Sequence, residues 1–272
     1  MKKFTVFPVT AIMVLYLISA AAYAQSLGDL AREEQKRRDS IYVDEAITLE
    51  VASPIAESDE ETSSGVVTNA VQAQSPTRST TVGNALSDVK FEIADNPVKG
   101  DASSGLILVE FIDYECPFCS RYVRETLPQI LRQYVDNGVI QYAVIDFPLS
   151  IHPRAAKAAE ASHCAGEQGK FWEIHDLMMA KQKSLGDLSS FAVSLNLNIS
   201  KFNNCVNSGK YASMVSRNIA LAQKLGINSA PNFIIGRVNS SRSRKVTGIS
   251  MIRGAVPFTR FQMELNAALS MR

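Results

Sequence analysis

The chain has 272 residues with 28 basic and 27 acidic side chains, and its formal net charge is +1. That balance excludes the strongly basic surface of a typical nucleic-acid-binding protein. Hydrophobic residues make up 46% of a chain long enough to bury a core without covalent help, so disulfides are not needed to hold the fold. At least one pair among the four cysteines is therefore expected to serve chemistry; they are Cys116, Cys119, Cys164 and Cys205.

Residues 1–24 have the pattern of a secretory signal peptide. Two lysines precede an apolar run, and the small-x-small sequence from Ala22 to Ala24 provides a cleavage signal. We expect cleavage after Ala24, which leaves 26 basic and 27 acidic side chains. The alternative is an uncleaved membrane anchor, which Pro8 and Thr10 disfavour in an apolar run of marginal length.

Residues 25–87 are polar and poor in aromatic side chains. Their stretches rich in Ser, Thr, Pro and Glu cannot bury enough apolar surface to fold alone. A short charged helix over 26–38 is the one local element that the sequence favours here. We interpret the region as a linker or stalk, with homo-oligomerisation through it as an alternative to a plain tether.

Downstream of this polar region, the sequence alternates between strand and helix patterns. The continuous apolar run at 106–113 predicts a buried strand. A helix is expected to begin near Cys116 and end at Gly138, and Pro128 can kink it. The remaining predictions are a strand at 139–149, a helical block at about 152–225, strands at 231–236 and 245–250, and a helix at 256–271. This order predicts one α/β domain over residues 88–272, with a helical insertion.

The cysteines of the sequence CPFC, Cys116 and Cys119, lie where a predicted strand gives way to a predicted helix. A structural zinc site commonly needs a second close pair of ligands, which the chain lacks. A purely structural disulfide is disfavoured because so small a ring removes little chain entropy on closing. A redox pair needs a stabilised thiolate, and a helix N-terminus supplies free N–H groups and the positive end of a dipole. Pro117 suits an early helical position that needs no N–H partner.

Three stretches together resemble the DsbA-like thiol–disulfide oxidoreductases. They are FIDYECPFCSRY at 111–122, ASHCAGEQGKFWEIHDLM at 161–178 and GINSAPNFIIG at 226–236. The resemblance covers roughly residues 88–270 and does not extend to residues 25–87. It implies a thioredoxin-like fold with an inserted α-helical subdomain.

By this resemblance, Cys116 is the exposed nucleophile and Cys119 the buried resolving thiol. Pro231 matches the family's cis-proline, which faces the active disulfide and can pair with an extended substrate strand. Glu110 matches a buried acid that moves protons to and from the resolving cysteine, and a carboxylate in an apolar strand stays protonated or finds a partner. The alternatives are an ordinary trans proline that opens a strand, and a glutamate that reaches solvent.

Two positions depart from the family pattern. Phe118 stands where strongly oxidising relatives carry a histidine, so the pKa of the nucleophile is expected to be lowered less than in those relatives. Ala230 stands where relatives often have Thr or Val, which leaves substrate release and preference open. The candidate substrate-binding residues are Tyr114, Pro117, Phe118, Ala230 and Pro231. For Tyr114 and Phe118, simple packing beside the nucleophile is the alternative.

The second pair, Cys164 and Cys205, falls in the predicted helical block. Many DsbA-like relatives have a second disulfide in matching contexts, so the resemblance implies a structural bridge, with a regulatory redox role as the minority view. His163 is adjacent to Cys164 and points about 100° away on a helix, which disfavours a catalytic pair. His152 is interpreted as a capping or surface residue. The aromatic and apolar residues between Phe171 and Met178 have helical spacing and are expected in the core.

The combined prediction is an exported thiol–disulfide oxidoreductase of the bacterial periplasm or cell envelope. It would exchange disulfides with unfolded or misfolded cysteine-containing proteins, as an oxidase or isomerase. A membrane redox partner of the DsbB or DsbD type is implied, and no dissociable cofactor or metal is needed because the cysteine pair is the redox centre. The alternatives are a disulfide reductase and a surface-exposed binding or chaperone protein with little redox activity.

Overall fold

The computed structural model describes residues 89–238 and 244–271, which all lie in one compact unit of the chain, residues 55–272. The predicted signal peptide and the predicted polar stalk lie outside the described residues. Within the described part, no helix is long and apolar enough to cross a membrane.

A six-stranded mixed sheet forms the centre of the described domain, with the strand order β1-β6-β5-β3-β4-β2. Strands β3 and β4 are parallel, and every other neighbouring pair is antiparallel. The strands are β1 (Lys90–Glu92), β2 (Val98–Lys99), β3 (Leu106–Ile112), β4 (Gln141–Asp146), β5 (Asn232–Val238) and β6 (Lys245–Arg253).

The hydrophobicity of each strand matches its place in this order. All seven residues of β3 and all six of β4 are buried, as expected for central strands covered on both faces. Strands β1 and β2 occupy the two edges and were not predicted, because two or three residues are too short to form a recognisable strand pattern. The predicted strands at 231–236 and 245–250 exist and extend further, to Val238 and Arg253.

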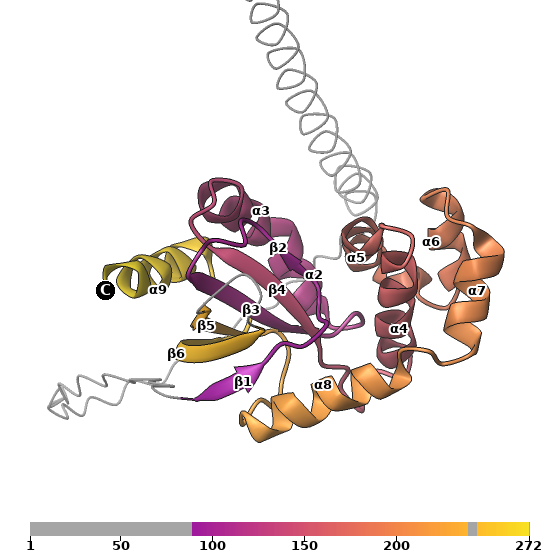
Figure 1. Ribbon diagram of the computed structural model, residues 1–272. Coiled ribbons are helices and arrows are strands. Elements are labelled where there is room, and N and C mark those ends of the chain that lie inside the picture. The colour runs from indigo at the N-terminus through magenta and orange to yellow at the C-terminus, as the bar shows by residue number, and fades with distance from the viewer. Residues whose placement is uncertain (1–88, 239–243, 272) are drawn as a thin grey trace, which may run out of the picture. The chain divides into compact units, whose positions relative to one another are not determined.

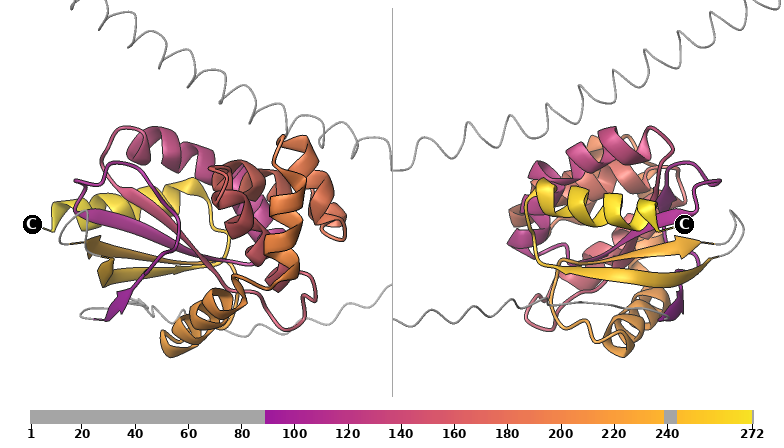
Figure 2. Two further views of the ribbon diagram at one scale, coloured as in Figure 1. Left: turned by 45° about the vertical axis from the view of Figure 1, so that its right-hand side comes forward. Right: turned by 90° about the vertical axis from the view of Figure 1, so that its left-hand side faces the viewer.

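Helices cover both faces of the sheet and one of its ends. Figures 1 and 2 show α2, α3 and α9 on one face, α8 on the opposite face, and the helices α4 to α7 beyond the end of the strands. The helices are α2 (Pro117–Glu125), α3 (Leu127–Ile130), α4 (Ala155–Gly166), α5 (Phe171–Ala180), α6 (Leu188–Ser194), α7 (Ile199–Asn207), α8 (Ala212–Lys224) and α9 (Phe258–Ser270), with short turns η1 (Leu131–Val135) and η2 (Gln182–Ser184). This arrangement confirms the predicted α/β, thioredoxin-like fold with inserted helices.

The helix predicted to run from Cys116 to Gly138 is interrupted beside Pro128, where the sequence predicted a kink, and it ends at Val135. Helix α2 ends at Glu125, α3 follows, and a π-helical turn, η1, completes the segment. Pro128 accounts for the break, because it has no N–H to donate and its ring clashes with the carbonyl four residues earlier. The interruption sits well beyond the cysteines, so α2 still presents an intact N-terminal turn to them.

Candidate active site

Cys116 occupies the N-cap position of α2, directly after the loop that follows β3. Pro117 is the first helical residue, where its missing N–H costs nothing. The backbone N–H groups of Cys119 and Ser120 donate to the Cys116 carbonyl at 3.1 and 3.2 Å, which closes the first turn. The turn therefore places Cys119 on the inner side of the helix, where it is completely buried.

Cys116 is buried, which corrects the prediction of an exposed nucleophile. Only 4% of its surface is accessible, because the turn at Pro231 lies over the helix tip. The Ala230–Pro231 peptide bond is cis, and Cys116 Sγ lies 3.3 Å from the Ala230 carbonyl oxygen, to which it donates when protonated. The exposed apolar surface beside the cysteines belongs to Phe118, which is 55% accessible.

The two thiols have opposite electrostatic environments. The hydrogen bond from the Cys119 thiol, together with the backbone N–H groups of Cys119 and Phe118, lowers the pKa of Cys116 from 9.0 to about 6, although burial and the Asp113 charge oppose this. Burial, followed by the neighbouring Cys116 thiolate, raises the pKa of Cys119 well above its ordinary value. At neutral pH, Cys116 is thus a thiolate and Cys119 a thiol. Disulfide exchange requires this difference between the two cysteines.

We expect alkylation of the reduced protein to show this asymmetry. Cys116 should react with iodoacetamide with a pH midpoint near 6, because only the thiolate is nucleophilic and the pKa of Cys116 is lowered to about 6. Cys119 should stay unmodified throughout the neutral range. Peptide mass mapping after timed quenching would identify the modified cysteine, and a midpoint of about 8.5, the value of an ordinary cysteine, would contradict the prediction.

Glu110 lies in the middle of β3, and its side chain is completely buried. The Tyr142 hydroxyl on the parallel neighbour β4 donates to Glu110 Oε2, while Oε1 has no partner among the described residues. Burial raises the pKa of Glu110 to about 8; the Cys116 charge adds to this, and the Tyr142 hydrogen bond opposes it. The carboxyl group is therefore protonated at neutral pH. Its pKa is raised in part by the charge of Cys116, and a charge on Glu110 in turn raises the pKa of Cys119.

Tyr114 is buried, which favours simple packing over the alternative of a substrate-binding surface. It is 1% accessible, and its hydroxyl lies 3.2 Å from Nδ1 of His175 on α5. Burial lowers the pKa of His175 to about 3, so this pair is neutral and packs the insertion against the cysteine loop. The predicted core face on α5 is confirmed for Phe171, His175, Leu177 and Met178, which are buried, whereas Trp172 is only half-buried.

Sequence reasoning missed several residues that hold the cysteine loop in place. Gln182 donates from Nε2 to the carbonyl oxygens of Tyr114 and Cys116, each at 2.9 Å. Ser120 on α2 donates to the Met179 carbonyl oxygen at 2.8 Å. The Gln182 contacts join the helical insertion to the nucleophile loop, and the Ser120 contact joins α2 to α5. An ordinary Gln or Ser in a predicted helix gives no signal of such a role.

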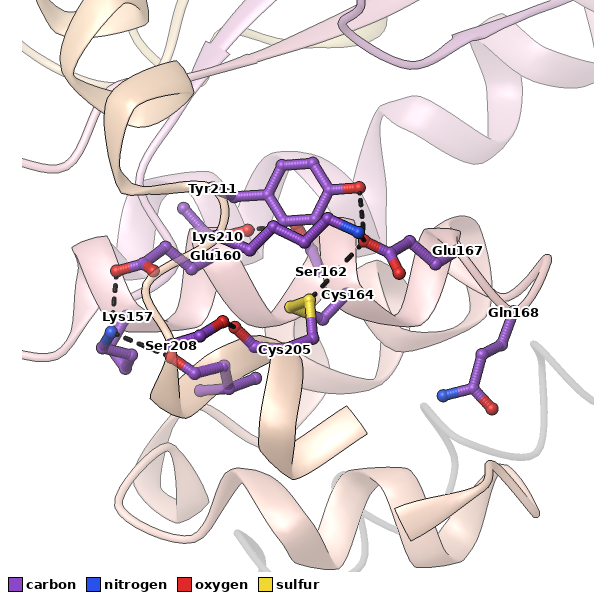
Figure 3. Close-up of a disulfide and its surroundings, with 12 residues drawn as sticks. Lys157, Glu160, Ser162, Cys164, Glu167, Gln168, Cys205, Ser208, Lys210 and Tyr211 are labelled. Atoms are coloured by element: carbon purple, nitrogen blue, oxygen red, sulfur yellow. Dashed lines mark hydrogen bonds and ion pairs between the residues drawn. A yellow bond between two sulfur atoms is a disulfide. The ribbon is translucent and has the colours of Figure 1, made fainter. Parts of the chain in front are cut away.

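Cys164 on α4 and Cys205 on α7 form a disulfide 41 residues apart in sequence. Figure 3 shows it beside Glu167, whose Oε1 accepts hydrogen bonds from Lys210 at 2.6 Å and Tyr211 at 2.9 Å. His163 does not face Cys164; its Nε2 lies 2.7 Å from Asp146 on β4. The bridge therefore joins two helices of the insertion and is separate from the CPFC pair.

Removing this disulfide should destabilise the domain without removing its chemistry. We expect the double replacement of Cys164 and Cys205 by alanine to lower the free energy of unfolding by about 3 to 4 kcal/mol, since a loop of 41 residues is released. Urea unfolding of both proteins would measure the difference. The alkylation midpoint of Cys116 serves as the control and should stay near that of the unaltered protein.

Among the described residues, no cluster of three or more His, Cys, Asp or Glu side chains could hold a metal ion. The features that remain are a thiolate at a helix N-terminus, a buried thiol one turn inside and a cis-proline turn whose Ala230 carbonyl contacts Cys116, carried on a thioredoxin-like sheet. Fold and site together define a thiol–disulfide oxidoreductase.

Comparison with known proteins gives the family. A family model described as Thioredoxin matches residues 93–252, more than half of the chain. The chain shares its fold and 26% of its aligned residues with α-DsbA1 of Wolbachia pipientis, with a TM-score of 0.57 over 65% of this chain and 92% of that one. The chain belongs to the thioredoxin family and is one of its DsbA-like oxidoreductases.

Two further relatives show how far the likeness extends. Oxidised BdbD from Bacillus subtilis is 20% identical with a TM-score of 0.58, over 68% of this chain and 98% of that one, and shares the fold. The Na(+)/H(+) antiporter NhaA 3 of Salinispora tropica is 32% identical over 162 residues, which are 58% of this chain and 24% of the antiporter. This chain therefore matches only about a quarter of the length of the antiporter. The name antiporter describes the whole of that longer protein.

Proposed function

We propose that this protein is exported and exchanges disulfides with cysteine-containing proteins through Cys116 and Cys119, as an oxidase or isomerase. The observation that carries the proposal is the position of Cys116 at the N-terminus of α2, with its thiol 3.3 Å from the carbonyl that precedes the cis-proline. A thiol whose pKa is lowered to about 6 is about nine-tenths thiolate at pH 7, so the reduced form is stabilised and the disulfide is a better oxidant.

In the oxidising direction, a substrate thiolate attacks the Cys116 sulfur. The Cys116–Cys119 bond breaks, a mixed disulfide forms with Cys116, and Cys119 leaves as a thiolate. A second substrate thiolate then attacks the substrate sulfur of the mixed disulfide and expels Cys116 as a thiolate. The substrate gains one disulfide and loses two electrons, and the Cys116–Cys119 pair gains both.

Glu110 is suited to manage the proton of this reaction. Cys119 leaves into a fully buried site where its thiolate is strongly disfavoured, so it must take up a proton. Glu110 is buried nearby and protonated at neutral pH, because burial raises its pKa to about 8. It can give its proton to Cys119 when the disulfide opens and recover it when Cys119 attacks the mixed disulfide in the reverse direction.

The proposed substrate surface is smaller than the sequence suggested. Pro117 and Phe118 are exposed beside Cys116. Ala230 and Pro231 are buried, so they would contact a substrate only through backbone groups. An extended substrate strand that pairs with the Ala230 carbonyl would bring its cysteine to Cys116, with Phe118 supplying apolar contact.

The proposal includes a cellular compartment and redox partners. A signal-like segment at residues 1–24 and a second disulfide fit an oxidising bacterial periplasm or envelope. Continued turnover needs a protein that reoxidises or rereduces the CPFC pair, for which a membrane partner of the DsbB or DsbD type is the proposal. No dissociable cofactor takes part in this scheme, and homo-oligomerisation through residues 25–87 remains a proposal.

The reduction potential of Cys116–Cys119 tests the direction of electron flow. Equilibration in glutathione buffers, followed by acid quenching and mass counting of alkylated thiols, gives the value. A potential between about −180 and −120 mV is expected for an isomerase or oxidase, and a value near −270 mV would make the protein a reductase. Failure of the two thiols to titrate as a pair would contradict the exchange function altogether.

A further inference from the structure

Asp113 joins the nucleophile loop to the loop that follows β4. Its side chain is completely buried, and three donors surround its carboxylate at 2.7 Å each: the Glu115 N–H on Oδ1, and the Leu149 N–H and His152 Nδ1 on Oδ2. Its backbone carbonyl also accepts the N–H of Cys116 at 3.1 Å. A single residue therefore fixes the peptide group of the nucleophile and the neighbouring loop.

His152 is the only side chain among these three donors, so it is the one that substitution can remove. A carboxylate can only accept at neutral pH, so Nδ1 carries the proton of this bond. The His152 side chain is 19% accessible, and its backbone N–H donates to the Leu149 carbonyl oxygen at 2.9 Å, which folds this loop back on itself. The sequence interpretation of His152 as a capping or surface residue therefore missed its contact with Asp113.

The same pair is connected to the thiolate electrostatically. The negative charge of Asp113 raises the pKa of Cys116, against the donors that lower it. A hydrogen bond to the charged carboxylate offsets part of that negative charge and fixes its direction. Without His152, the carboxylate would lose a donor and present more of its charge to Cys116.

We propose that His152 is a positioning residue for the nucleophile, acting through Asp113 by holding the buried carboxylate and offsetting its charge near Cys116. The inference deepens the proposed exchange function and rests on it. The side chain of His152 bonds to Asp113, so its effect on Cys116 is expected to pass through this carboxylate.

The fold should tolerate the substitutions of His152 that test this role. An ion pair between Glu115 and Arg154 also joins the same two loops. Glu115 Oε1 lies 2.7 Å from Arg154 Nε and 2.6 Å from Arg154 Nη2. Leu149 keeps its own backbone bond to Asp113 when His152 changes. Circular dichroism and the Cys164–Cys205 disulfide provide independent checks of folding.

The measurement is the pH midpoint of Cys116 alkylation in the reduced, full-length mature protein. His152→Ala should raise the midpoint by about half a pH unit or more. His152→Asn should recover most of this shift, because the side-chain amide group lies roughly where Nδ1 donates. Ser150→Ala, an exposed position in the same loop, is the matched control and should match the unaltered protein.

A double-mutant cycle tests the route through Asp113. Asp113→Asn should lower the midpoint, since it removes a charge that disfavours the thiolate, and His152→Ala should then have no further effect. The proposal would be overturned by an unchanged midpoint in His152→Ala, by an equal shift in both His152 variants, or by a shift that persists when Asp113→Asn is already present. If the midpoints show the expected pattern but the protein does not exchange disulfides with other proteins, the positioning role is supported and the proposed function is contradicted.

Discussion

Replacing Cys116 by serine is expected to lower the rate of disulfide exchange to the uncatalysed background. The serine hydroxyl is neither a thiolate at neutral pH nor able to form the disulfide with Cys119, so both half-reactions lose their reacting atom. Oxidative folding of a reduced cysteine-containing protein, followed by the return of its activity, measures the loss. Turnover retained by this variant would contradict the catalytic role of Cys116, whereas a binding or chaperone protein would keep its binding activity without Cys116.

Cys119→Ser is the matched control, because it makes the same chemical change one turn further into α2. This variant keeps the Cys116 nucleophile and loses the resolving thiol. It should accumulate mixed disulfides with substrate proteins, visible on non-reducing gels and cleared by dithiothreitol. The pair of variants thus separates attack by Cys116 from resolution by Cys119.

Glu110→Gln is expected to stabilise the protein by about 3 to 5 kcal/mol at pH 8, with almost no effect near pH 4.5. Glu110 has an ordinary pKa of 4.5 and a folded pKa of about 8, because burial disfavours the charged carboxylate. Between these values the folded state binds the proton more tightly than the unfolded state, so stability falls as pH rises, by about 1.4 kcal/mol per unit. The glutamine removes this loss and still accepts the Tyr142 hydrogen bond.

Urea unfolding of the reduced proteins at pH 4.5 and pH 8 measures the effect as a difference between variant and unaltered protein. Glu92→Gln on the exposed side of β1 is the control and should change the free energy of unfolding by less than about 0.5 kcal/mol at both pH values. Equal stabilisation at both pH values would show that packing, and not the buried proton, carries the effect. Glu110→Gln should also slow exchange, because a glutamine cannot pass a proton to Cys119.

The sequence predicted those parts of the site that lie close together in the chain. A buried strand, CPFC and the start of a helix all fall within residues 106–125, and the chemistry of a helix N-terminus follows from that order. The strand containing Glu110 was found because continuous apolar runs mark central strands. The order of the elements predicted one α/β domain, and the resemblance of three stretches implied its thioredoxin-like fold.

The parts that escaped prediction depend on contacts between distant segments. Asp113 and His152 are 39 residues apart, and Gln182 is 66 residues from Cys116, so no local period marks either contact. The burial of Cys116 and Tyr114 has the same origin, because the segments that cover them come from beyond β4. An aspartate directly after a buried strand was the one local signal that could have been followed, since the end of such a strand often carries functional side chains.

Gln182 has a consequence for engineering this scaffold. Its side-chain amide binds the carbonyls of Tyr114 and Cys116, and Ser120 binds the Met179 carbonyl, so the insertion helps to set the conformation of the nucleophile loop. The insertion is therefore not an exchangeable module. A chimera that receives its helices from another protein would need a matching amide and carbonyl at these two contacts, or it would keep the sheet and lose the reactivity.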